Sequence, residues 1–200
     1  MGRVSREKAL EHRSQIVDAA ARQFRERGFD RVSIADLMKE VHLTHGGFYK
    51  QFASKDVLLA EATQRAFEDL TVSLRAYDRE HDNRAAAKSE LIDYYLSPEH
   101  RDDLAQGCPS TGLSADLMRS ETSPDARLRY AEGVEDFARW LGDHDEETPA
   151  SDEAIREASL LVGALVLARA SAGTPLSDRI LAAVRGGHAP SESHAGTGAS

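Results

Sequence analysis

The segment from Ser33 to Lys55 gathers side chains that can bind a polyanion. Hydroxyl, imidazole, phenol and ammonium groups occur in it at short spacing: Ser33, Thr44, His45, Tyr49, Lys50 and Lys55. Groups of these kinds form hydrogen bonds with phosphate oxygens and with the edges of bases. Two consecutive glycines, Gly46 and Gly47, stand among them, although each glycine costs a helix about 1 kcal/mol relative to alanine. Their presence favours a close approach of the backbone to another surface.

Two short helices must position these groups. Ser33 and Asp36 have the spacing of a capping box, which predicts the start of the first helix. Three apolar residues form its inward face: Leu37, Met38 and Val41. A tight turn at residues 42–43 follows, and Thr44 is expected to open a second helix over residues 44–51. Two helices about such a turn form a helix-turn-helix, whose second helix enters the major groove of DNA.

Two longer helices are expected to flank this pair. The first begins near Ser5 and ends at Gly28, because glycine suits the left-handed backbone at a helix end. Its apolar face consists of Ile16, Val17, Ala20 and Phe24. A further helix begins at Ser54 and carries apolar residues at three- and four-residue steps: Leu59, Ala62, Ala66, Leu70, Leu74 and Tyr77. Phe48 and Phe52, four residues apart, are expected to lie in the core between these helices.

The rest of the chain is also predicted to be helical. Pro, Gly and Ser or Thr punctuation delimits helices over residues 84–96, 99–106, 110–119, 124–144, 152–172 and 175–184. Because no stretch alternates with period two, we expect an all-α protein of about nine to ten helices. We expect a helix-turn-helix head over residues 1–53 and a larger helical body over 54–185. The glycine-rich residues 186–200 are expected to form a flexible tail.

Charge is distributed unevenly along the chain. The sequence has 25 Lys and Arg against 34 Asp and Glu, a formal net charge of −9. Residues 1–60 hold 11 basic and 8 acidic residues, a net +3, so residues 61–200 carry −12. This asymmetry indicates a small module that meets a polyanion, attached to an acidic body that repels one. Chance clustering of charge on solvated faces is the alternative.

The single cysteine and the lack of a long apolar run indicate the cellular setting. Cys108 cannot form an internal disulfide, so we expect a reducing compartment and a cytoplasmic protein. Residues 158–168, the longest nearly apolar stretch, are too short to span a membrane, and no membrane contact is expected. We expect no metal, cofactor or enzyme activity, because the spacing of a zinc-binding His pair and of a phosphate-binding loop is missing. A Cys108-dependent enzyme with His100 as its base is the alternative.

Three motifs follow one another between Arg27 and Leu58. They read Arg27-Gly28-Phe29, Ser33-Ile34-Ala35-Asp36-Leu37 and Leu43-Thr44-His45-Gly46-Gly47-Phe48-Tyr49-Lys50-Gln51-Phe52-Ala53-Ser54-Lys55-Asp56-Val57-Leu58. In this order they resemble the signature of the TetR family of transcriptional regulators, over about a quarter of the chain. His45 departs from the pattern, since a basic or small polar residue is common there, and the base preference is left open.

The resemblance implies a homodimer with two DNA-binding heads and a body that holds an effector pocket. It implies phosphate contacts for Tyr49, Lys50 and Lys55, and it places residues 44–47 against the bases. Ser33, at the start of the preceding helix, is assigned to the same DNA-binding group. Further basic residues either add to this charge or are ordinary solvated groups: Arg3, Arg6, Lys8, Arg25 and Arg27.

The predicted helix over residues 152–172 is apolar nearly all round and needs cover on two sides. One side is expected to face the body's own core, and the other a second copy of the chain, together with helix 124–144. The residues assigned to this dimer interface are Val134, Leu141, Leu161, Leu165 and Ala168. A monomer with a deeply buried central helix is the alternative.

The effector pocket is assigned to aromatic and apolar residues of the body together with one cysteine and one arginine: Tyr95, Cys108, Leu117, Phe137, Trp140 and Arg169. Plain core positions, and for Arg169 a solvated or paired side chain, are the alternatives. Cys108 is either a redox or electrophile sensor at a helix start or a buried small hydrophobe.

These expectations combine into one function. We expect a repressor that binds a palindromic operator in double-stranded DNA as a dimer and is released by a small molecule. A helical ligand-binding or scaffold protein without specific DNA binding is the alternative.

Overall fold

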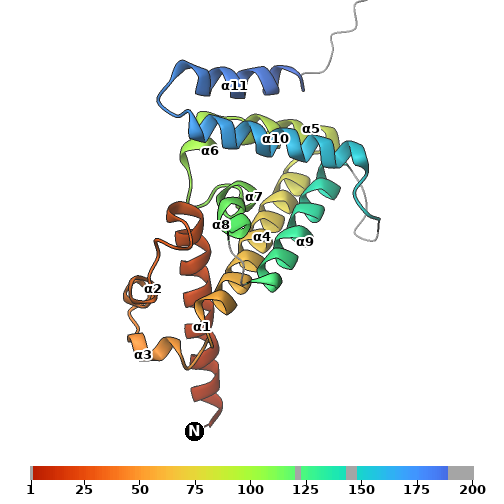
Figure 1. The fold of residues 1–200 in the computed structure, drawn as a ribbon. Helices are drawn as coiled ribbons and strands as arrows, with labels where there is room; N and C mark the ends of the chain where they lie inside the picture. Colours follow the sequence, from red (N-terminus) through yellow and green to blue (C-terminus); the bar gives the residue numbers. More distant parts are fainter. Residues whose placement is uncertain (1, 120–122, 143–147, 189–200) are drawn as a thin grey trace, which may run out of the picture.

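The computed structural model describes residues 2–119, 123–142 and 148–188, with side chains from residue 6 onward. Over these ranges the chain forms eleven helices and no strand, which confirms the all-α class (Figure 1). The helices are α1 (Gly2–Arg27), α2 (Ile34–Glu40), α3 (His45–Phe48), α4 (Lys55–Glu80), α5 (Arg84–Tyr95), α6 (Pro98–Asp102), α7 (Pro109–Gly112), α8 (Ser114–Arg119), α9 (Pro124–Leu141), α10 (Asp152–Ala170) and α11 (Pro175–Gly186).

The helix count differs from the expected nine to ten. Residues 110–119, expected as one helix, belong to two, α7 and α8, which meet at Leu113. Residue 144, where the expected helix 124–144 ends, and residues 189–200 of the expected tail lie outside the described ranges. Within those ranges no helix combines the length and the apolar character that a membrane span requires.

Local signals end α1 and start α2 as predicted. Gly28 follows α1 with a φ of +85°, the left-handed conformation expected of a glycine at a helix end. Ser33 and Asp36 form both bonds of the capping box: Ser33 Oγ accepts from the Asp36 N–H, and the Asp36 carboxylate accepts from the Ser33 N–H. The turn before α3 has its own left-handed residue, His42, with a φ of +55°.

The helix α3 is shorter than the predicted residues 44–51. It spans only His45–Phe48, and Thr44 precedes it in an extended conformation without a side-chain cap. Beyond the helix the backbone tightens, since the Gln51 N–H donates to the Phe48 oxygen three residues earlier, at 2.8 Å. Two glycines in four residues give little intrinsic helical stability. The shape of α3 therefore depends on contacts with its surroundings.

The long helix α4 joins the two ends of the molecule and lies side by side with α9 (Figure 1). Ser54 caps α4 as predicted, accepting a hydrogen bond from the Val57 N–H. The close packing of α4 and α9 requires a glycine at position 133. A Cβ there would lie 2.1 Å from Cγ of Phe67, a distance at which the two helices would have to separate.

Buried apolar residues form two clusters towards the two ends of α4. The first joins α1, α2, α3 and the start of α4 with residues from beyond them: Leu113, Leu117 and Ala126. The second joins the end of α4 with α5, α9, α10 and α11. Because Leu117 lies on α8 and Ala126 on α9, the N-terminal helices share their core with later parts of the chain.

Candidate nucleic-acid interface

The start of α3 lies on the molecular surface. Five residues expected to meet DNA are exposed: Thr44, His45, Gly46, Tyr49 and Lys50. Phe48 and Phe52 point the other way and are buried, with their rings stacked at a centroid distance of 5.4 Å. The predicted inward placement of these two phenylalanines is confirmed. The segment thus has an apolar side anchored in the first cluster and a polar side open to solvent.

The two glycines of this segment have different surroundings. A Cβ on Gly46 would meet no heavy atom within 4 Å, so the space in front of it is open. At Gly47 a Cβ would lie 3.4 Å from Cε of Met38 and 3.6 Å from Oγ1 of Thr44, which are ordinary contact distances. Packing inside the protein therefore requires glycine at neither position.

Ser33 is exposed but already has a structural role. Its hydroxyl donates to the Asp36 carboxylate at 2.7 Å and accepts from the Asp36 N–H at 3.1 Å. The hydrogen bonds from the Ser33 hydroxyl and N–H lower the pKa of Asp36 below its ordinary value. Ser33 thus fixes the start of α2, the first helix of the helix-turn-helix.

Lys55 is placed differently from Tyr49 and Lys50. Its ammonium donates a hydrogen bond to the backbone oxygen of Phe29 and lies 4.0 Å from the centroid of the Phe29 ring. Burial lowers the pKa of Lys55. In this conformation Lys55 joins α4 to the turn after α1, so we assign it a structural contact rather than the expected phosphate contact.

Arg25 is likewise not part of a free basic surface. The side chain is buried, its Nε donates to the Ala21 oxygen at 3.0 Å, and its Nη1 lies 3.4 Å from the Gly107 oxygen. Burial lowers the pKa of Arg25. Its position four residues after Ala21, beside the apolar stripe of α1, is the sequence signal that predicts this burial. Arg25 connects α1 to the loop before α7.

The residues assigned to an effector pocket are mostly core residues in this structure. Tyr95, Cys108 and Phe137 are buried in the second cluster, and the rings of Tyr95 and Phe137 stack at a centroid distance of 5.8 Å. Trp140 belongs to the same cluster, where its Nε1 donates to the Asp78 carboxylate at 3.0 Å. Leu117 lies in the first cluster instead, apart from these four residues.

Cys108 and His100 meet through the backbone. His100 accepts a hydrogen bond at Nε2 from the Cys108 N–H, at 3.2 Å, and its Nδ1 lies 2.8 Å from the Tyr95 oxygen, which makes Nδ1 the protonated nitrogen. Burial lowers the pKa of His100. Because both ring nitrogens are engaged by the backbone, His100 cannot serve here as a base for the Cys108 thiol. The thiol itself is buried, as in the structural alternative.

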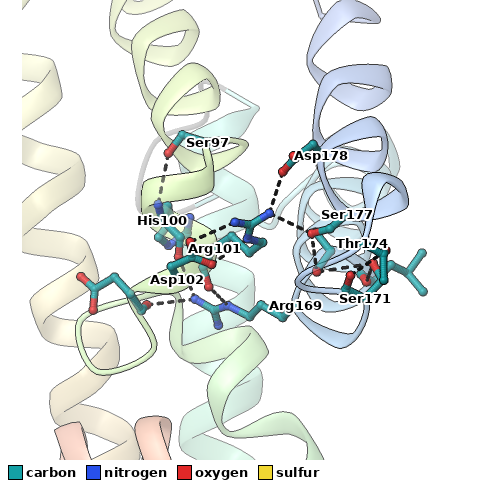
Figure 2. A network of polar contacts seen from close by, with 12 residues as sticks. Ser97, His100, Arg101, Asp102, Arg169, Ser171, Thr174, Ser177 and Asp178 are labelled. Carbon is teal, nitrogen blue, oxygen red and sulfur yellow. Dashed lines mark hydrogen bonds and ion pairs between the residues drawn. The ribbon is translucent and has the colours of Figure 1, made fainter.

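Arg169 holds α6 and the loop that follows it. Its guanidinium donates to three backbone oxygens, those of His100, Arg101 and Asp103, at 3.0, 3.0 and 3.1 Å. Its Nη1 also donates to Oγ1 of Thr111. Figure 2 shows this side chain reaching α6 from α10, while Arg101 extends from α6 towards Ser177 and Asp178 of α11. Burial lowers the pKa of Arg169. The arginine is thus bound within the fold, as a linker between α10 and α6.

The assigned dimer interface differs from the exposed apolar surface. Four of its residues are covered by their own chain, which makes their assignment wrong: Leu141, Leu161, Leu165 and Ala168. Val134 is half-buried. On α10 the exposed apolar side chains are instead Ile155, Leu160, Val166 and Leu167. One apolar side of α10 is covered by the chain's own core as expected, but the α10 residues assigned to the second copy lie on that covered side.

The sequence profile of the bacterial regulatory proteins of the TetR family matches residues 16–62, from the middle of α1 to the first turns of α4. These residues form a TetR-family domain. The matched range includes the capping box, the turn at His42 and the exposed start of α3, so this TetR domain coincides with the region whose polar side is open.

Similar proteins extend the comparison beyond that range. The transcriptional regulator TtgR of Pseudomonas putida is 32% identical over 93 residues, which is 46% of this chain but only 40% of TtgR. Escherichia coli NemR in its reduced form has the same fold, with a TM-score of 0.71 at 18% identity over 90% of this chain and 95% of NemR. A transcriptional regulator from Saccharomonospora viridis in complex with choline has a TM-score of 0.65 at 19% identity, over 88% and 94% of the chains.

Proposed function

We propose that this TetR-family protein is a repressor that binds a palindromic operator in double-stranded DNA as a homodimer and is released by a small molecule. The observation that carries the proposal is the open space in front of Gly46, on an exposed polar segment whose other side is buried. A glycine that internal packing does not need, and that weakens its own helix, is explained by close approach to another surface. The major groove of DNA admits such a helix.

The proposed contacts follow from which groups the fold leaves exposed. Residues 44–47 would approach the base edges, and Tyr49 and Lys50 would bind phosphates on either side. Ser33 would contribute at the exposed start of α2, where its hydroxyl also serves the cap. The net +3 of residues 1–60 favours association with a polyanion, although Arg25 and Lys55 are engaged inside the fold.

For the dimer we propose the exposed side of α10 in place of the residues assigned from the sequence. Its apolar side chains include Leu160 and Leu167, which are 49% and 59% exposed. On α9 the exposed Leu128 stands beside charged residues, among them the ion pair Arg129–Glu132. An apolar face of this kind favours a self-complementary interface about a two-fold axis.

For the effector we propose a small molecule that binds in the body beside Tyr95. The Tyr95 hydroxyl is buried beside the Cys108 thiol and forms no regular hydrogen bond with the described residues. Among the same residues, the buried Ser110 Oγ also has no hydrogen-bond partner. Buried polar groups lose free energy when they are left unbonded. A ligand that forms hydrogen bonds with these groups in a second arrangement of the body would favour that arrangement. It would lower DNA affinity by the difference between its binding free energies to the two arrangements. The S. viridis structure is a complex with choline, which supports a small-molecule ligand for a protein of this fold.

Selection of binding sites from random duplex DNA tests the proposal. We expect the retained sequences to share a palindrome, because a two-fold dimer reads two half-sites. The double variant Leu160→Glu, Leu167→Glu should sediment as a monomer and retain no palindrome, whereas Leu128→Glu, at an equally exposed leucine of α9, should behave as the wild type. Failure of the wild type to retain any sequence selectively at low salt would instead support a ligand-binding or scaffold protein without specific DNA binding.

A further inference from the structure

Arg13, on the inward side of α1, bonds to the end of the segment that contains α3. Its guanidinium donates to the backbone oxygen of Gln51, three residues after α3, and lies 4.1 Å from the centroid of the Phe52 ring. The same guanidinium pairs with both carboxylate oxygens of Glu61 on α4, with Nε to Oε2 at 3.1 Å. One side chain thus joins α1, the residues after α3 and α4.

This junction lies just after α3, the helix that is proposed to read bases and that has little stability of its own. The helix α3 has four residues, two of them glycines, and no side-chain cap at Thr44. Its own backbone therefore does little to fix its direction. Buried Phe48 and Phe52 hold it at one side, and Arg13 is a polar contact that holds the backbone at its end.

The charge of Glu61 matters for this role. A guanidinium that binds a carboxylate with two parallel hydrogen bonds is held in one plane. Because Nε and Nη2 of Arg13 are bound to the Glu61 carboxylate, its Nη1 is directed at the Gln51 oxygen. Both side chains are partly exposed, 31% for Arg13 and 35% for Glu61, and such pairs contribute only about 0.2–1 kcal/mol to stability. Stability alone gives little reason for the arrangement.

We infer that Arg13, oriented by Glu61, is a positioning residue that sets the direction of α3 for base reading. The inference rests on the proposed function and deepens it, because it separates the groups that touch DNA from one that aims them. Removal of Arg13 should leave α3 attached but able to tilt. A tilt of α3 would displace the groups that read base edges, which carry the sequence information, whereas non-specific binding depends on charge. Specific binding should therefore suffer more than non-specific binding.

The test compares Arg13→Met with a matched variant, Arg22→Met. Arg22 also lies on α1 and pairs with a partly exposed acid, Glu40 at the end of α2, so its loss controls for removing a surface pair. Dissociation constants are measured for the selected palindrome and for a random duplex of equal length, over a range of salt. For Arg13→Met we expect the ratio of the two constants to fall about 10-fold or more, a loss comparable to that of one base-pair mismatch. The non-specific constant and the salt slope should stay as in the wild type. For Arg22→Met the ratio should change less than about 3-fold.

Other results would overturn the inference. If Arg13 contacts a phosphate instead, Arg13→Met should bind both duplexes more weakly and lower the salt slope by about one unit. An unchanged ratio in a folded Arg13→Met variant would show that α3 is aimed without it. If Arg13→Met does not fold, Glu61→Gln decides, since it keeps the size of the side chain and should lower the ratio to an intermediate value; an unchanged ratio in Glu61→Gln would overturn the inference. A wild type without any selected palindrome would contradict the proposed function rather than this role of Arg13.

Discussion

The polar residues of the N-terminal helices and those of the body have different surroundings. In and just after α3, His45 and Lys50 are exposed on a segment whose apolar side is buried. In the body, the groups with comparable chemistry, His100 and Arg169, are engaged by backbone oxygens and N–H groups of their own chain. A residue type thus indicates function only where the fold leaves the group available. Exposed polar groups that are open to a partner thus distinguish the proposed DNA surface from the body, where the comparable groups are bonded to their own chain.

Two glycines give the largest test of this difference. Gly133→Ala should lower the free energy of unfolding by about 2–3 kcal/mol, because its Cβ would lie 2.1 Å from a ring carbon of Phe67 and α4 would have to move away from α9. Gly46→Ala should raise the free energy of unfolding, by at most about 1 kcal/mol, because nothing lies within 4 Å of the new Cβ. Urea denaturation of both variants at equal protein concentration measures the two changes.

Gly46→Ala also distinguishes an effect on stability from an effect on DNA binding. Gly46→Ala should weaken binding to the selected DNA although the protein is more stable, since the methyl group would occupy the space proposed for the DNA. A destabilised Gly46→Ala variant, or a stable one that binds DNA as well as the wild type, would contradict the distinction between the open and the packed region.

Signals close together in the sequence predict the N-terminal helices well. The capping box at Ser33, the glycine at position 28 and the cap at Ser54 all depend on residues within a few positions, and the structure has each of them. The length of α3 is the exception. Its pattern of Phe48 and Phe52 suits a helix of two turns, but two glycines favour the shorter helix and the tighter turn that follows it.

Contacts between distant segments explain what the sequence does not predict. The apolar face of α10 is so wide that spacing alone cannot say which side faces the core, and the dimer residues are assigned to the wrong side. Lys55 carries the motif of a phosphate contact, yet its partner is the Phe29 oxygen, 26 residues earlier in the chain. Arg13 has its partner 48 positions away at Glu61. Only its place four residues before Val17, on the inward side of α1, indicates a role in packing.

The two lysines of the recognition region give a smaller test of the comparison. Lys50→Ala should lower the dependence of DNA affinity on salt by about one unit, because one phosphate contact and its released counterion are lost. Lys55→Ala should leave that slope unchanged and reduce the free energy of unfolding instead, since its ammonium is bound to Phe29. Titrations with a random duplex at several salt concentrations measure the slope, and urea denaturation measures stability. A lowered slope for Lys55→Ala would show that its ammonium leaves Phe29 when DNA binds.

The smallest expected effect is the dependence of stability on pH through His100. Burial lowers the pKa of His100 in the folded protein, while the unfolded chain binds this proton at about pH 6.5. Below that pH the unfolded state therefore binds more protons, and stability should fall as the pH decreases from about 6.5. Protonation would also remove the acceptor for the Cys108 N–H, which His100 supplies at Nε2. The stability of the body should thus depend on pH because His100 is buried and hydrogen-bonded at both ring nitrogens.

His100→Asn isolates this effect, because asparagine keeps a donor for the Tyr95 oxygen and does not titrate. The wild type should lose more stability than His100→Asn between pH 7 and pH 5, measured by urea denaturation at one protein concentration. The difference between the two curves is needed because His81 acts in the opposite sense: its hydrogen bonds to the Tyr77 oxygen and to Glu90 raise its pKa and favour folding at low pH. Since both proteins contain His81, its contribution cancels. Parallel curves would show that His100 is protonated equally in the folded and unfolded chain, and that this part of the body is as open as the surface of α3.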